Sequence, residues 1–166
     1  MVDDLSIRRA REDDVPRLRE LMEAAHRDAG AYFEDVGDDF DGLDDEYFPD
    51  GEFLVGERGG RIVASIAYRD PGEMIRSVAD VSEKAVQLKR FNVAPEYQRR
   101  GYGGRIYDEL EACARNADSE GIILHTTGRQ TAARRFYEKR GYDPVERADI
   151  EEFSEAFELF VYWKRL

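Results

Sequence analysis

A short glycine-rich turn carries the residues of this sequence best suited to chemistry. It reads Gln98-Arg99-Arg100-Gly101-Tyr102-Gly103-Gly104-Arg105 and stands between a predicted strand and a predicted helix. Glycines have no Cβ, so backbone N–H groups can point into one concavity, and the start of the helix adds the positive end of its dipole. Three arginines and no acid lie within these eight residues. The turn therefore predicts a cradle for a phosphate-bearing anion.

Spacing excludes two familiar phosphate-binding motifs at this turn. A P-loop needs four residues between its first glycine and a Gly-Lys-Ser/Thr triplet, and no such motif occurs in the chain. A Rossmann turn needs Gly-x-Gly-x-x-Gly, but Ile106 stands three residues beyond Gly103. The alternative to a phosphate cradle is a tight strand-to-helix turn whose arginines are only solvated.

The single cysteine and the two histidines limit disulfide formation, metal binding and catalysis by thiol or imidazole groups. Cys113 alone excludes a disulfide framework and a multi-cysteine metal site, and only His26 and His125 could add ligands, so we expect no metal. Cys113 falls on the apolar stripe of a predicted helix and is expected in the core. His125 titrates in a range useful for acid–base catalysis, but it stands in a strongly apolar strand, where a structural role is the alternative.

The elements that position these residues follow from hydrophobic periodicity and turn signals. Strands are predicted at residues 6–9, 53–57, 61–68, 85–93, 122–126, 142–147 and 156–164, and helices at residues 12–29, 39–48, 103–117 and 131–140. The polar stretch 70–84 is predicted to be a loop. No repeat and no linker divides the 166 residues, so we expect one α/β (α+β) domain over residues 1–166.

The charge of the chain narrows its partners and its setting. Thirty-seven acids against 25 bases give a net charge of −12, which disfavours nucleic acid and anionic membranes as partners. Neither a signal peptide nor a membrane-spanning apolar run is present, which favours a cytoplasmic protein. Only four of the bases are lysines. This balance is typical of a halophilic protein from a high-salt cytoplasm, and a GC-rich genome is the alternative.

Two motifs together resemble a known family. The Gln-x-x-Gly-x-Gly turn after Val93-Ala94-Pro95 resembles the acetyl-CoA signature of the GNAT family of N-acetyltransferases. The segments 124–130 and 133–142 are similar to the family's later strand and helix, so the resemblance covers about residues 87–142. It implies the GNAT fold, a mixed and mostly antiparallel sheet of six to seven strands with about four helices. That sheet is splayed between its fourth and fifth strands, here residues 85–93 and 122–126.

The resemblance also implies where acetyl-CoA, the acyl donor, would bind. Its pyrophosphate would lie on the glycine turn, and its pantetheine arm would pair with the backbone near Val93. The Val93 N–H would polarise the acetyl carbonyl. Gln130 stands where the family often has Asn. The implied CoA-binding residues are Phe91, Val93, Gln98, Arg99, Arg100, Gly101, Gly103, Gly104 and Gln130.

By the same resemblance, Tyr137 matches the family's general acid. A phenol with a pKa near 10 is neutral at working pH and can protonate a departing thiolate. The alternative is a tyrosine that only packs on the sheet. The general base stays unassigned, because Gln87 stands where related sequences often carry Glu. His125, Glu34 and Asp35 are the remaining candidates.

The sequence thus predicts an N-acetyltransferase that moves an acetyl group from acetyl-CoA to a primary amine by direct attack in a ternary complex. A catalytically weak acyl-CoA-binding or regulatory module on the same fold is the alternative, favoured by Gln87, and another acyl group stays open. Residues 28–52 hold eleven acids and no base, which suggests a cationic acceptor such as a polyamine or a lysine side chain. Salt adaptation alone is the alternative. A homodimer is common in the family.

The halophilic interpretation predicts a salt response. Self-repulsion among the excess acids should weaken the fold in dilute buffer, whereas in about 1 M KCl the screening length falls to ~3 Å. We expect the melting temperature to rise markedly between these conditions, as measured by differential scanning calorimetry. A flat response would contradict the interpretation.

Overall fold

A seven-stranded mixed sheet forms the centre of the protein. The computed structural model describes residues 4–28, 47–48, 51–128, 130–150 and 157–166, and the account below concerns these residues. In sheet order the strands are β1 (Ser6–Arg9), β2 (Glu52–Arg58), β3 (Arg61–Arg69), β4 (Ala85–Val93), β5 (Gly121–Thr127), β7 (Phe157–Arg165) and β6 (Asp143–Ile150). Every neighbouring pair is antiparallel except β4 and β5, which are parallel.

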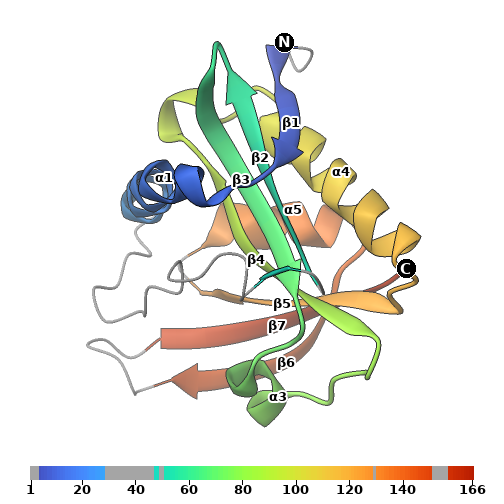
Figure 1. Ribbon diagram of the computed structural model, residues 1–166. Coiled ribbons are helices and arrows are strands. Elements are labelled where there is room, and N and C mark those ends of the chain that lie inside the picture. The colour runs from blue at the N-terminus through green and yellow to red at the C-terminus, as the bar shows by residue number, and fades with distance from the viewer. Residues whose placement is uncertain (1–3, 29–46, 49–50, 129, 151–156) are drawn as a thin grey trace.

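Four α-helices and two short 3-10 helices accompany the sheet in the described ranges (Figure 1). They are η2 (Glu12–Asp14), α1 (Val15–Asp28), α3 (Glu73–Val78), η3 (Pro95–Tyr97), α4 (Tyr102–Asn116) and α5 (Thr131–Lys139). Neighbouring residues of a strand point to opposite faces of its sheet. Leu54 packs in the cluster of α4, whereas Val55 packs in the cluster of α1. The two helices therefore cover opposite faces of the first half of the sheet.

The sheet separates between β4 and β5. The two strands pair over only three positions, from Ala85 opposite Gly121 to Gln87 opposite Ile123. Beyond Gln87, the remaining two thirds of β4 forms no strand pairs with β5 in the described part of the chain. Figure 1 shows β1–β4 and β5–β7 as two groups of strands that run in different directions.

A β-bulge in β4 lies within this unpaired part. The β3–β4 register shifts between the pairs Ser65–Asn92 and Ala67–Lys89. Arg90, within the bulge, has a φ of 57°, and the Ser65 hydroxyl donates a hydrogen bond of 2.7 Å to its carbonyl oxygen. A bulge bends its strand and increases the local twist. The bulge therefore bends β4 in the part of the strand that forms no pairs with β5.

The structure confirms the predicted fold class and most of the predicted elements, with two corrections. The stretch predicted as a loop at residues 70–84 contains α3, because Ile75 is buried against apolar residues of β5 and β7. Cys113 packs against the core as predicted but is only half-buried, because the fully buried face of α4 carries Tyr107 and Ala114 instead. The helix predicted at residues 39–48 lies almost wholly outside the described residues. Among the described helices, none is long and apolar enough to cross a membrane.

Gly121 stands where β5 meets both β4 and β7. A Cβ at this position would lie 2.5 Å from the carbonyl oxygen of Lys164 and closer still to the Trp163 ring. Since backbone cannot move aside easily, we expect Gly121→Ala to lower the free energy of unfolding by about 1–3 kcal/mol. Urea denaturation measures this loss.

Gly128→Ala is the matched control for that substitution. Its Cβ would make only ordinary contacts, the nearest at 3.6 Å from the Phe160 ring. A loss in Gly121→Ala no larger than the loss in this control would contradict the tight junction of the three strands.

Candidate functional site

The glycine turn opens α4 at the end of β4. Gly101 precedes the helix with a φ of 84°, and Arg99 also has a positive φ, 63°. The Gln98 side chain donates a hydrogen bond of 3.1 Å from Nε2 to the Val93 carbonyl oxygen, which closes the turn onto the strand. The first N–H groups of a helix have no partner within the helix. Those of Gly103 and Gly104 precede the bond from the Arg105 N–H to Gly101, so they are donors suited to an anion.

Packing does not require glycine at position 103. A Cβ there would lie 3.6 Å from the Phe91 ring and 3.7 Å from Val93, which are ordinary contacts. The open backbone at this position therefore suits the close approach of a ligand. Arg99 and Arg100 are exposed beside it, and the Arg100 guanidinium lies 5.1 Å from the centre of the Tyr97 ring.

Tyr137 lies on α5, close to the unpaired part of β4. Its side chain is buried, and its ring centre lies 6.3 Å from that of Phe91 and 5.5 Å from that of Tyr142. Burial raises the pKa of Tyr137 above its ordinary value, since desolvation disfavours the phenolate. The phenol is therefore protonated at neutral pH and can donate a proton.

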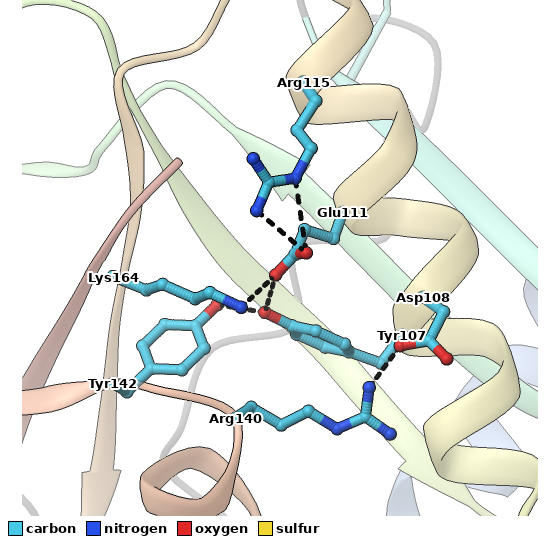
Figure 2. A network of polar contacts seen from close by, with 7 residues as sticks. All are labelled: Tyr107, Asp108, Glu111, Arg115, Arg140, Tyr142 and Lys164. Atoms are coloured by element: carbon cyan, nitrogen blue, oxygen red, sulfur yellow. Dashed lines mark hydrogen bonds and ion pairs between the residues drawn. The ribbon is translucent and has the colours of Figure 1, made fainter.

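A polar network supports the aromatic residues around Tyr137 (Figure 2). The Tyr142 and Tyr107 hydroxyls lie 2.8 Å apart, and the Tyr107 hydroxyl donates to Glu111 at 2.9 Å. Lys164 of β7 donates to the same carboxylate at 2.6 Å. Although burial raises the pKa of Glu111, the bonds from Lys164 and Tyr107 lower it overall. The network therefore joins α4 and β7 to Tyr142, whose ring packs on Tyr137.

Two glutamine side chains of the site accept hydrogen bonds from backbone N–H groups. Gln130 precedes α5, and its Oε1 accepts hydrogen bonds from the Thr127 N–H at 3.1 Å and from the Thr126 hydroxyl at 3.0 Å. Buried Gln87 accepts a bond of 2.8 Å at Oε1 from the Gly72 N–H, just before α3. Gln87 therefore anchors the segment that leads into α3, and an amide cannot act as a base.

His125 and Lys89 lie at the root of the separation between the strands. Each stands two residues beyond the last β4–β5 pair, Gln87 opposite Ile123. His125 is half-buried, and burial, together with the nearby charge of Lys89, lowers the pKa of His125 to about 4. The imidazole is therefore neutral at pH 7 and only a weak base.

Cys113 does not offer a thiolate. Burial raises the pKa of its thiol, so the sulfur is protonated at neutral pH and a poor nucleophile. Within the described ranges, no group of three or more His, Cys, Asp or Glu residues could hold a metal ion.

The structure brings most of the predicted CoA-binding residues to one region. Phe91 and Val93 contact the position of Gly103, and Phe91 also lies against α5 beside Tyr137. Gln130 lies at the end of β5, where its side chain bonds to Thr127. Glu34 and Asp35 fall outside the described residues.

Sequence reasoning missed Arg140 at this site. Its guanidinium reaches the first turn of α4 at Gly104. The only signal in the sequence is one more base at the end of the helix that carries Tyr137. Spacing alone does not reveal that contact, because it joins two helices far apart in the chain.

The architecture and the sequence together define the class of protein. A mixed sheet that separates between its fourth and fifth strands, with a glycine turn at the opening, is a GNAT fold. The model of the acetyltransferase (GNAT) family matches residues 15–142, so the chain belongs to this family. No curated protein matches the sequence.

Solved structures share this fold over almost the whole chain. A GNAT-family acetyltransferase from Staphylococcus aureus Mu50 is 17% identical, with a TM-score of 0.78 over 98% of this chain and 99% of that chain. A ribosomal-protein-alanine N-acetyltransferase from Brucella melitensis is 21% identical, with a TM-score of 0.78 over 97% and 99%. YncA from Salmonella typhimurium, solved with its cofactor acetyl-CoA, is 19% identical, with a TM-score of 0.76 over 98% and 94%.

The pKa of His125 predicts a contribution to the pH dependence of stability. The unfolded chain binds a proton at His125 near pH 6.5, whereas the folded chain binds it only near pH 4. Lowering the pH through this window therefore favours unfolding. Between pH 6.5 and pH 5 we expect the natural chain to lose up to about 2 kcal/mol more stability than His125→Gln. Urea denaturation at both pH values measures the difference, and identical losses would contradict a neutral imidazole.

Proposed function

We propose that this chain is an N-acetyltransferase that transfers the acetyl group of acetyl-CoA to a primary amine by direct attack in a ternary complex. Membership of the GNAT family supports acetyl transfer. The protonated thiol of Cys113 supports direct attack, since it offers no ready nucleophile for an acyl-enzyme. The amine nitrogen bonds to the acetyl carbon, the carbon–sulfur bond breaks, and the sulfur leaves with the bonding pair.

The position of Tyr137 is the observation that carries this proposal. The phenol is buried, kept protonated by desolvation, and placed beside the unpaired part of β4. In the proposed reaction its hydroxyl proton passes to the departing sulfur, and the proton released by the amine restores the phenol through solvent. A water-poor setting favours such a transfer, because a thiolate is poorly stabilised there.

The strand edge and the glycine turn would bind the donor. Beyond Gln87, the β5-facing edge of β4 has no partner on β5, so it can pair with an extended amide-containing arm as with an added strand. The Val93 N–H would polarise the acetyl carbonyl. The N–H groups of Gly103 and Gly104, with Arg99 and Arg100, would take the pyrophosphate.

For the general base and the acceptor we propose a chemical class rather than a single group. Gln87 is occupied by the Gly72 N–H, and His125 is a weak base. Glu34 and Asp35 fall outside the described residues, so we propose that water or one of these two carboxylates removes the proton of the amine. A cationic amine remains the proposed acceptor, because residues 28–52 are strongly acidic.

A catalytically weak acyl-CoA-binding module is the second candidate. The observation that favours it is Gln87, whose amide holds backbone where a carboxylate base would otherwise stand. A panel of primary amines with acetyl-CoA, followed by release of free CoA thiol, separates the two. Tight binding of acetyl-CoA without amine-dependent thiol release would favour the module.

Tyr137→Phe tests the assigned general acid. The substitution removes one hydroxyl and little volume, so CoA affinity should persist while kcat falls by about 10²–10⁴. Steady-state thiol release measures kcat, and isothermal titration calorimetry measures affinity.

Tyr142→Phe is the matched control for the general acid. It removes another buried hydroxyl, the one that pairs with Tyr107, from a ring packed on Tyr137. We expect its kcat to fall less than about tenfold. Unchanged kcat in Tyr137→Phe, or equal losses in both variants, would assign Tyr137 to packing alone.

A further inference from the structure

Arg140 lies across the first turn of α4, although it follows α5 in the chain. A Cβ at Gly104 would lie only 2.6 Å from one guanidinium nitrogen of Arg140. The guanidinium also lies 4.9 Å from the centre of the Phe136 ring and 5.2 Å from that of Tyr107. Two aromatic rings and a glycine therefore hold this cation at the N-terminal turn of α4.

The partner of Arg140 is a carboxylate at the surface. Asp108, one turn along α4 from Gly104, forms an ion pair with the guanidinium (Figure 2). The Asp108 side chain is 66% exposed, whereas that of Arg140 is 30% exposed. Packing against the two rings therefore holds the Arg140 guanidinium, whereas the Asp108 carboxylate is largely surrounded by solvent. An ion pair this exposed contributes little to stability, so the carboxylate can be displaced.

The chemistry of the guanidinium fits a phosphate in this place. Its planar fork donates two parallel hydrogen bonds to phosphate or carboxylate oxygens. Asp108 supplies a carboxylate with one negative charge, and a phosphate group supplies more charge and more acceptor oxygens. The same turn of α4 presents the N–H groups of Gly103 and Gly104.

We propose that Arg140 binds a phosphate group of the ADP portion of CoA, and that this phosphate displaces Asp108 from the guanidinium. This inference rests on the proposed function. It gives Gly104 a separate role, because a Cβ at this position would require the tip of the Arg140 side chain to move from its place beside the turn. The 3′-phosphate and the pyrophosphate are the two groups of CoA that offer this chemistry.

The test compares variants of both partners by isothermal titration calorimetry with CoA and with 3′-dephospho-CoA. Arg140→Met should weaken CoA binding about tenfold, the loss expected for a charge-assisted hydrogen bond. Asp108→Asn should tighten CoA binding about two- to fivefold, because the competing carboxylate is removed. The opposite signs distinguish phosphate binding from mutual structural support.

Arg115→Met is the matched control. Arg115 lies on the same helix in an ion pair with Glu111, but about 16 Å further along its axis. We expect its CoA affinity to equal that of the natural chain. Thermal melts of all variants check folding, and Arg140→Lys, which keeps the charge but not the fork, should bind CoA with intermediate affinity.

Each outcome bears on the proposal. If Arg140→Met loses affinity only for CoA, Arg140 contacts the 3′-phosphate. If it loses affinity equally for CoA and 3′-dephospho-CoA, Arg140 contacts the pyrophosphate. Either result supports the proposal. Unchanged affinity for both ligands, or weaker binding in Asp108→Asn, would overturn it and leave the proposed function standing. Failure of the natural chain to bind CoA would overturn both.

Discussion

The limited pairing of β4 with β5 is the constraint on which the rest of the structure depends. Three residue pairs join the strands, and the bulge at Arg90 lies in the part of β4 beyond these pairs. A β-strand that lacks a neighbour normally exposes backbone donors and acceptors. Here that edge lies inside the sheet, beside the glycine turn that opens α4. An extended ligand can therefore complete the sheet without exposing an outer edge.

Both sides of this separation are held by side chains far apart in the chain. On one side, the Ser65 hydroxyl fixes the bulge of β4. On the other, Lys164 and Tyr107 meet at Glu111, which ties the last strand to α4. Packing around Tyr137 depends on these contacts through Tyr142. The position of the Tyr137 phenol therefore depends on contacts among α4, α5 and β7.

Local signals were enough to predict most of the helices and strands, whereas the arrangement of the sheet was predicted from the resemblance to the GNAT family. The hairpin at Gly59-Gly60 and the apolar strand β5 carry unambiguous patterns, and both are present. The helix α3 was missed because it is short and buries chiefly Ile75 in an otherwise polar stretch. Side-chain contacts were not predictable, because they depend on tertiary packing. Neither the anchoring of Gly72 by Gln87 nor the contact of Arg140 with Gly104 has a sequence signature.

Hydrogen–deuterium exchange with and without CoA tests the central claim most directly. The claim is that the unpaired edge of β4 and the glycine turn bind the acyl donor through backbone groups. Amides in residues 88–93 and 98–104 should exchange more slowly at saturating CoA, while those of the β6–β7 pair should not change. Unaltered exchange in residues 88–104 at saturating CoA would contradict the account.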